Sequence, residues 1–138
     1  SAKVGWHLRS LLSPGTRMAL EHGGAAPVIL DETADVDLLV PKLAKGGFYH
    51  SGQVCVSVQR VFMLGKQKEE IVSKLGEYAT NLTVGNAIDE KTECGPLIRN
   101  REVDRVESWV NEAQNGGAKV IAGGKQCSRN TTRNQTCI

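Results

Sequence analysis

A cysteine and a glutamate, each close to glycine, are the residues of this chain whose types and surroundings could do chemistry. Cys55 lies in the stretch GQVCVSVQR, residues 52–60, where a glycine permits close approach of the backbone to a ligand. A thiolate attacks carbonyl carbons well, and a backbone N–H after a tight turn can stabilise the resulting oxyanion. Free cysteine is also among the most buried residue types. The local pattern therefore leaves open both a nucleophile and a buried structural thiol.

Glu21 lies in the stretch LEHGG, between an apolar run and the pair Gly23-Gly24. We expect this carboxylate to be partly desolvated, which would raise its pKa toward the range that suits a general base. A helix cap or a salt-bridge partner is the alternative role. The glycine pair could serve a nucleotide or merely a turn.

Ser1 opens the stretch SAKVG, which could begin a helix. Free backbone N–H groups at such a helix start can hold a phosphate, although a plain capped helix would have the same sequence. The three histidines have no ligand spacing, so no metal site is expected. The other cysteines, Cys94, Cys127 and Cys137, form no CxxC pair and are interpreted as free thiols.

Composition excludes several classes of function. The net charge of +2 and the aromatic content of 4% argue against a nucleic-acid partner. No apolar run approaches the roughly 20 residues of a membrane helix, so no membrane partner is expected. No signal segment opens the chain, and the default prediction is a cytoplasmic location.

The elements that must position these residues alternate between amphipathic helices and short apolar strands. Helices are predicted over 1–12, 66–82 and 100–117 and within 31–52. Short parallel strands are predicted near 27–30, 60–65 and 119–122. This alternation predicts an α/β fold, with a partial three-layer unit.

Finer expectations concern single residues of these elements. Pro41 should lie in a first helical turn or at a bend, because its ring disrupts a helix interior. Gly116-Gly117 should end the last helix. The apolar side chains of that helix should face inward: Val103, Val106, Trp109, Val110 and Ala113.

Taken in order, five motifs resemble the aldehyde dehydrogenase superfamily: SAKVG, LEHGGAAPVIL, GQVCVSVQR, VGNAID with TECGPLI, and GGAKVIAGG. The family's Glu-Leu-Gly-Gly motif appears as Glu21-His22-Gly23-Gly24, and its cysteine motif as Gly52-Gln53-Val54-Cys55. Its later Gly-Pro-Leu appears as Gly95-Pro96-Leu97. The resemblance covers residues 1–125 and implies the fold of that family's catalytic domain.

The resemblance implies a role for each candidate residue. Cys55 would form a thiohemiacetal with an aldehyde, and a hydride would pass to NAD or NADP to leave a thioester. Glu21 would activate the water that hydrolyses this thioester, and could also help to deprotonate Cys55. Ser1, Glu21 and Gly23 would contact the cofactor. The substrate would be a small aldehyde, and a homo-oligomer is expected.

The sequence also departs from the family's pattern. His22 replaces the usual leucine, which should alter packing near Glu21. Segments that hold the rest of the cofactor in the family are absent, so we expect 1–125 to be part of a catalytic domain with little or no activity by itself. The polar stretch 126–138 is expected to be a disordered tail.

Two other functions remain open at this point. One is a non-catalytic α/β module that self-associates through exposed apolar faces. The other is a thiol hydrolase that uses Cys55 and Glu21 without a cofactor. Binding of NAD+ would separate the first from a dehydrogenase, and turnover of an activated ester without NAD+ would support the second.

Overall fold

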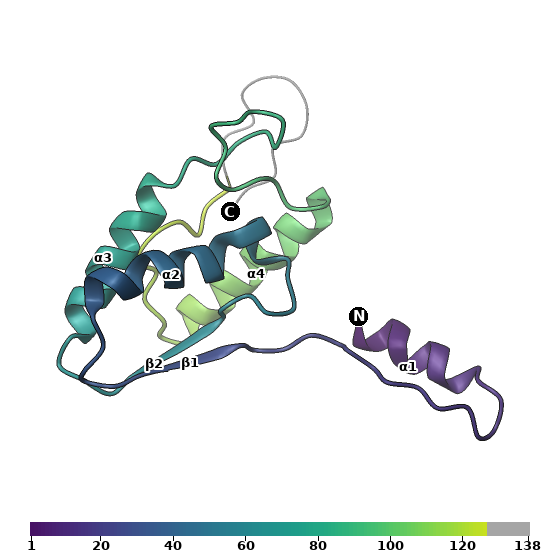
Figure 1. Cartoon of the computed structure of the whole chain (residues 1–138). Coiled ribbons are helices and arrows are strands. Elements are labelled where there is room, and N and C mark those ends of the chain that lie inside the picture. Colours follow the sequence, from purple (N-terminus) through teal and green to yellow (C-terminus); the bar gives the residue numbers. More distant parts are fainter. Residues whose placement is uncertain (127–138) are drawn as a thin grey trace.

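The computed structural model describes residues 1–126, in which four α-helices accompany two short strands (Figure 1). The segment that carries α1 reaches away from a body formed by the remaining elements (Figure 1). The predictions for 127–138, including Cys127 and Cys137, lie outside the described residues. In chain order the elements are α1 (Ala2–Ser10), β1 (Pro27–Leu30), α2 (Val36–Phe48), the 3-10 helix η1 (Tyr49–Gly52), β2 (Arg60–Met63), α3 (Lys68–Asn81) and α4 (Asn100–Asn115).

The strands β1 and β2 are parallel, and α2 connects them, which makes a β-α-β unit. Their register pairs Pro27 with Arg60 and Leu30 with Met63. This confirms the predicted α/β unit with short parallel strands. On one face of the sheet, side chains from both strands pack with α2 and α3 around a core formed by Leu30, Val36, Val40, Leu43 and Ile71.

The opposite face of the sheet carries Ile29 of β1 and Phe62 of β2, which pair in register and are both exposed. Only Leu30 of β1 is buried, although an apolar stretch such as 27–30 is typical of a strand that is buried on both faces. The reason is that the described elements cover one face only, and strand residues point alternately to the two faces.

Helix α2 begins at Asp35, whose carboxylate accepts the backbone N–H groups of Asp37 and Leu38 at 3.0 and 3.1 Å. A helix therefore starts within 31–52, as the sequence predicts. Pro41 lies inside this helix and beyond its first turn, so the first of its two predicted places was wrong, and a bend at Pro41 stays a prediction. The neighbours Val40 and Leu43 are buried in the core, and their burial favours a helix that continues past the proline.

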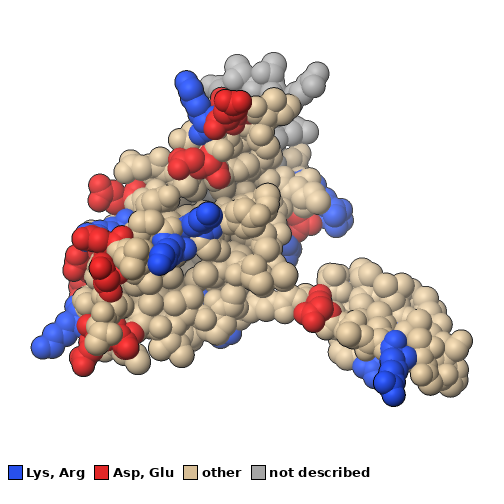
Figure 2. All heavy atoms as spheres, viewed as in Figure 1, with Lys and Arg blue, Asp and Glu red and all other residues tan. Residues whose placement is uncertain are grey.

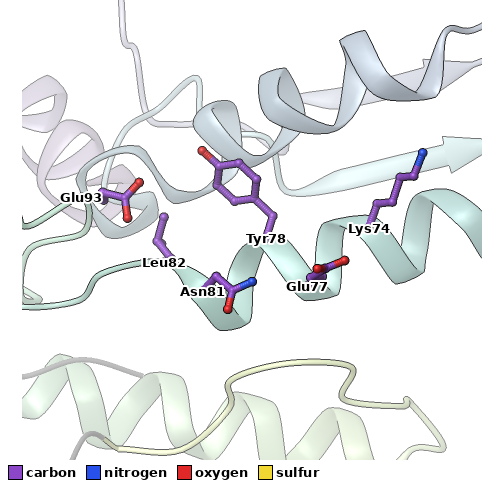
Figure 3. Close-up of a pocket in the computed structure, with 6 residues that line it drawn as sticks. All are labelled: Lys74, Glu77, Tyr78, Asn81, Leu82 and Glu93. Atoms are coloured by element: carbon purple, nitrogen blue, oxygen red, sulfur yellow. The ribbon is translucent and has the colours of Figure 1, made fainter.

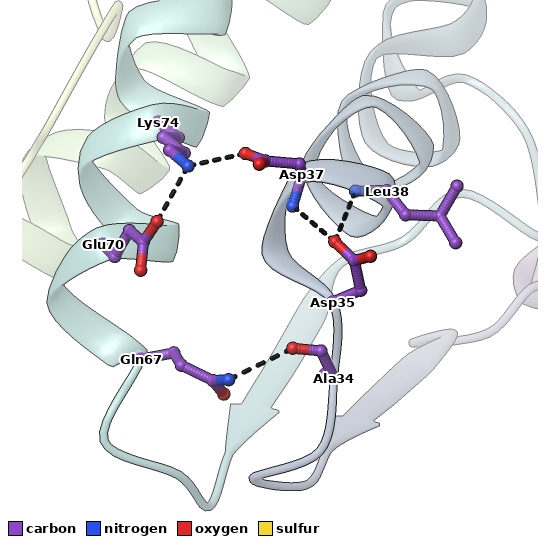
Figure 4. A network of polar contacts seen from close by, with 7 residues as sticks. All are labelled: Ala34, Asp35, Asp37, Leu38, Gln67, Glu70 and Lys74. Carbon is purple, nitrogen blue, oxygen red and sulfur yellow. Dashed lines mark hydrogen bonds and ion pairs between the residues drawn. The ribbon is translucent and has the colours of Figure 1, made fainter.

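Polar contacts join α2 to α3 at the exposed end of the core (Figure 4). The Lys74 ammonium lies 2.6 Å from Asp37 of α2 and 2.8 Å from Glu70 of its own helix. The hydrogen bond to Asp37 and, to a smaller extent, the hydrogen bond to Glu70 raise the pKa of Lys74. The Gln67 amide donates to the carbonyl oxygen of Ala34 at 3.1 Å, which ties the start of α3 to the start of α2.

Helix α4 ends at Gly116, and Gly117 follows with φ 95°, which confirms the predicted glycine stop. Fewer residues of α4 face the core than the sequence predicts. Val103 is buried, whereas Trp109 and Ala113 are exposed. The Trp109 ring instead packs under the guanidinium of Arg105, whose Cζ atom lies 4.5 Å from the ring centroid.

The strand predicted at 119–122 is absent from the described structure. Val120 and Ile121 instead line an apolar cavity of about 420 Å³ between α3 and α4, together with Leu75 and Val110. Ile121 lies so close to α3 that a side chain at Gly76 would come within 2.8 Å of it. A strand needs a neighbouring strand for its hydrogen bonds, and the described sheet ends at β1 and β2.

Charged side chains of both signs are interspersed over the body on the face shown in Figure 2, while the segment carrying α1 is mostly uncharged there. This mixture agrees with the small net charge. Among the described residues, every helix is too short or too polar to cross a membrane.

Replacing Ile71 by alanine is expected to lower the free energy of unfolding by about 2–5 kcal/mol, because it opens a cavity in the core. Ile71 is 2% exposed and packs with residues of α2 and β1. Ile88 is the matched control, because it is 88% exposed and its replacement by alanine removes almost no buried area. Urea unfolding of both variants measures the difference; equal midpoints would contradict this description of the core.

Candidate active site

Cys55 occupies a tight turn between η1 and β2, with its thiol exposed. The backbone N–H of Ser57 donates to the carbonyl oxygen of Val54 at 3.0 Å and closes the turn. The β-branched run around Cys55 therefore does not form a strand until Arg60. An exposed turn favours the reactive interpretation of Cys55, because a buried structural thiol would be inaccessible.

Ser57 fixes the far end of this turn to α2. Its side chain is 4% exposed, and its hydroxyl donates to the carbonyl oxygen of Gly47 at 3.1 Å. The next N–H along the chain, from Val58, donates to Gly46 at 2.9 Å. These contacts hold the residues that follow Cys55, on the way to β2, against the end of α2.

The segment that carries Glu21 meets the Cys55 turn through Gly24. A side chain at Gly24 would come within 3.5 Å of the Cys55 carbonyl oxygen, so the two backbones lie in close contact. Glu21 precedes Gly24 by three residues, which limits their Cα separation to about 11 Å. Glu21 is exposed, so its predicted desolvation was wrong. The apolar run before it lies on the extending N-terminal segment, where few groups cover the carboxylate.

His22 joins the Glu21 segment to α1. Its imidazole packs against Gly5, where an added side chain would come within 2.5 Å of Nε2. Its ring also meets the edge of Trp6, with 5.3 Å between ring centroids. The Nε2 atom is buried without a hydrogen-bond partner among the described residues. The predicted change in packing beside Glu21 is therefore a contact with α1.

Ser1 caps α1, since its hydroxyl oxygen accepts the N–H of Val4 at 3.4 Å. The first turn of α1 carries no acidic side chain that would repel an anion. Gly23 has φ 123° and open space where a side chain would lie, so only glycine fits this conformation easily. These features suit an anionic ligand at the helix start, and Gly23 leaves room beside Glu21.

Two residues of this site escaped sequence reasoning. Ser51 and Gln53 precede Cys55 and contact residues 94–98, where Gln53 Oε1 accepts the N–H of Ile98 at 2.9 Å. These partners are 45 residues apart in the sequence, and no local pattern reports such a contact. The one signal of this contact in the sequence is that the same chain contains both motifs, GQVC and GPL.

Cys94 is the other cysteine that the structure describes, and it is half-buried. Its sulfur lies 3.4 Å from the Ser51 hydroxyl and 3.8 Å from the carbonyl oxygens of Phe48 and Gly95. The Cys94 sulfur is therefore enclosed by backbone and hydroxyl oxygens and is less accessible than that of Cys55.

In the folded protein, Cys55 is expected to react with limiting iodoacetamide at least tenfold faster than Cys94. The physical reason is that Cys55 is exposed whereas Cys94 is half-buried among carbonyl oxygens. Peptide mapping after partial alkylation measures both rates, and alkylation in denaturant supplies the control in which the two thiols should converge. Faster labelling of Cys94 in the folded protein would contradict the assignment.

A separate polar cavity of about 380 Å³ lies along α3 and reaches Glu93 (Figure 3). In the close-up Tyr78 projects from the C-terminal half of α3, between Lys74 and the last residue of the helix, Asn81. Its lining includes neither Cys55 nor Glu21. The predicted catalytic residues therefore belong to a different part of the surface.

Comparisons with known proteins agree on one family. The family model described as "Aldehyde dehydrogenase family" matches residues 1–138. The chain is 40% identical to a 3-sulfolactaldehyde dehydrogenase of Priestia megaterium over 127 residues, which are 91% of this chain and 26% of that protein. It is 37% identical to a lactaldehyde dehydrogenase of Methanocaldococcus jannaschii over 126 residues, covering 91% of this chain and 27% of the relative.

Solved structures give the same result. A betaine aldehyde dehydrogenase from Staphylococcus aureus in complex with NAD+ superposes with a TM-score of 0.85 at 32% identity, over 92% of this chain and 25% of that chain. The present chain spans about a quarter of the length of the curated relatives named above. The segments that carry Glu21 and Cys55 lie within residues 1–138, which the family model matches.

Proposed function

The chain belongs to the aldehyde dehydrogenase family, and on that premise we propose that Cys55 is the nucleophile of an enzyme that oxidises an aldehyde to a carboxylic acid. The observation that carries the proposal is the exposed Cys55 turn in contact with the backbone of the Glu21 segment at Gly24. A nucleophile and a general base on touching segments can act on one bound substrate.

Cys55 begins the reaction as a thiolate that adds to the carbonyl carbon of the aldehyde. A C–S bond forms, and the carbonyl oxygen becomes the oxyanion of a thiohemiacetal. Collapse of this oxyanion expels a hydride from the same carbon and leaves a thioester on Cys55. The exposed position of the thiol in its turn supports the first step, since the aldehyde can approach without prior opening of the core.

Glu21 then acts as the general base of the second half-reaction. Its carboxylate takes a proton from water, the resulting hydroxide attacks the thioester carbon, and the C–S bond breaks to release the carboxylic acid and the Cys55 thiolate. Glu21 is exposed, so water reaches it directly. The close approach of Gly24 to Cys55 limits how far this carboxylate lies from the thioester.

A nicotinamide cofactor is part of the proposal, and the residues at the start of α1 fit its pyrophosphate. Ser1 caps the start of α1 through the N–H of Val4, and no acidic side chain in the first turn opposes an anion there. Gly23 keeps the space beside Glu21 open. We propose that Ser1, Glu21 and Gly23 contact NAD+ or NADP+. When bound, the cofactor accepts the hydride that leaves the substrate carbon.

The test of this function is reduction of NAD+ or NADP+ when short aldehydes are added to the purified protein, followed by the absorbance of the reduced nicotinamide. The proposal expects turnover that requires both the aldehyde and one of the two cofactors. Hydrolysis of an activated ester without cofactor, together with no aldehyde oxidation, would instead support a cysteine hydrolase.

A non-catalytic self-associating module is the second candidate, because α1 and the residues after it expose several large apolar side chains. These are Val4, Trp6, Leu8, Leu11 and Leu12. Exposed apolar patches mark association surfaces. This observation also supports the expected homo-oligomer, which is compatible with either candidate. Binding of NAD+ by the protein separates the two, since only the dehydrogenase requires it.

The 138-residue chain is expected to self-associate and to oxidise aldehydes far more slowly than a complete relative. Hydride transfer needs the cofactor and the thiohemiacetal within about 3–3.5 Å of each other, and such positioning can lower the barrier by roughly 7–11 kcal/mol. This chain spans about a quarter of the length of its relatives, so we expect it to position the two reactants less well. Light scattering and reduced-nicotinamide absorbance measure the two properties. Rapid Cys55-dependent oxidation by a monodisperse monomer would contradict this expectation.

A further inference from the structure

Just before Cys55 the backbone passes through three consecutive residues in the left-handed region. His50 has φ 47°, Ser51 has φ 57° and Gly52 has φ 70°. Glycine adopts this conformation freely, whereas residues with a side chain do so at a steric cost. Such a turn persists only where surrounding contacts hold it in place. The contacts of His50 and Ser51 therefore decide whether the approach to Cys55 is ordered.

Gln53 supplies contacts at both ends of its side-chain amide. Its Oε1 atom accepts the N–H of Ile98 at 2.9 Å. Its Nε2 atom donates to the carbonyl oxygen of His50 at 3.0 Å and to that of Pro96 at 3.4 Å. The hydroxyl of Ser51 donates to the carbonyl oxygen of Gly95. The Gln53 amide thus joins the left-handed turn to residues 94–98.

Residues 94–98 are themselves fixed at their start. The N–H of Cys94 donates to Thr83 at 3.1 Å, and the N–H of Gly85 donates back to Cys94 at 3.1 Å. These bonds form a short parallel bridge between Val84 and Cys94. Gln53 therefore binds a segment with its own support.

Between Gln53 and Ser57 only three residues remain, and Cys55 is the middle one. Ser57 is buried and bound to Gly47 of α2, so each end of this short arch has its own anchor. We propose that Gln53 is a positioning residue that holds the Cys55 thiol in place through residues 94–98. This role deepens the proposed function and rests on Cys55 being the nucleophile.

The test follows the Cys55 thiol with a fluorine label. Alkylation with a trifluoromethyl ketone reagent gives a 19F resonance that is assigned by its loss in Cys55→Ser. In the wild-type protein this resonance should be single and displaced from its position in denaturant. Gln53→Met, which keeps the length but removes donor and acceptor, should shift it to the denatured position. Gln59→Met is the matched control, because exposed Gln59 has no side-chain hydrogen bond among the described residues, and it should leave the resonance unmoved.

Gln53→Glu adds a readout that a general loss of stability would not produce. A neutral carboxylic acid can donate to the His50 carbonyl and accept from Ile98, as the amide does. A carboxylate cannot donate and would face two carbonyl oxygens. The wild-type resonance should therefore return as the pH falls from 8 toward the range of Glu titration near about 4.3. The pH profile of the wild-type protein is subtracted from that of the variant.

An unmoved resonance in Gln53→Met, or a Gln53→Glu spectrum that is independent of pH, would overturn the proposal. If Gln53→Met fails to fold, hydrogen exchange of the wild-type protein decides the question: Ile98 should exchange at least tenfold more slowly than in denatured protein, and equal rates would overturn the proposal. The label needs neither aldehyde nor cofactor. Retained aldehyde oxidation in Cys55→Ser would refute the nucleophile and leave the Gln53 result standing.

Discussion

Replacing Cys55 by serine is expected to abolish the slow aldehyde oxidation expected of this chain, because the reaction loses its nucleophile. A serine hydroxyl is far less ionised near neutral pH than a thiol, so it is a much weaker nucleophile in the same turn. The measurement is the rate of NAD(P)H formation at saturating aldehyde, compared with the wild-type protein under the same conditions.

Cys94→Ser is the control for this variant, since it removes the other described thiol and keeps a polar atom beside Ser51. It should retain activity within about threefold, the range typical of changes outside catalytic groups. Equal losses in the two variants would show that the thiols act through the fold rather than through chemistry at Cys55.

Replacing Glu21 by glutamine is expected to lower steady-state turnover by about 10²–10⁴-fold, the usual contribution of a general base. The amide keeps the size of the side chain but cannot take a proton from water, so the thioester on Cys55 should persist. A rapid first turnover followed by a slow steady rate would show this in stopped-flow absorbance.

Glu90→Gln is the matched control, because Glu90 is an exposed carboxylate in the turn-rich segment before α4. It should leave both phases unchanged. Loss of the first turnover in Glu21→Gln would mean that this carboxylate also takes the proton of Cys55. An unchanged steady rate would remove Glu21 from the mechanism.

The sequence predicts those helices and strands whose starts, ends or apolar faces are marked by residues within the element itself. Asp35 accepts the first N–H groups of α2, the apolar period of α3 brings Ile71 into the core, and Gly117 leaves α4 in a positive-φ conformation. Each of these depends on neighbours within a few residues. The α/β alternation follows because strand and helix periods differ locally.

Features that depend on distant partners could not be predicted in this way. Val120 and Ile121 have strand-forming side chains but meet α3 and α4 instead of a strand. Trp109 is spaced along α4 as a residue that faces the core would be. Its ring instead contacts the guanidinium of Arg105 on the surface. The prediction that Glu21 is partly buried was wrong for the same reason. The burial of a residue depends on which distant segments pack against it, and the sequence near Glu21 does not show this.

The candidate site shows the same division. The types of Cys55 and Glu21 and their motifs are visible in the sequence, and their roles rest on the family resemblance. The contact of Gly24 with Cys55 and the bonds from Gln53 to residues 94–98 appear only in the folded chain. The sequence therefore predicts the reactive groups, and the structure shows contacts around Cys55 that no local pattern predicts.

In the proposed mechanism, Cys55 carries the substrate as a thioester. The most direct measurement is mass spectrometry of peptides from Glu21→Gln protein that is incubated with an aldehyde and NAD+ or NADP+ and then quenched in acid. Long incubation detects even slow acylation, because the variant should not hydrolyse the product. We predict that the Cys55 peptide gains the mass of the acyl group only when aldehyde and cofactor are both present. An acyl group on Cys94, or no acyl group on Cys55 after prolonged incubation, would contradict the claim.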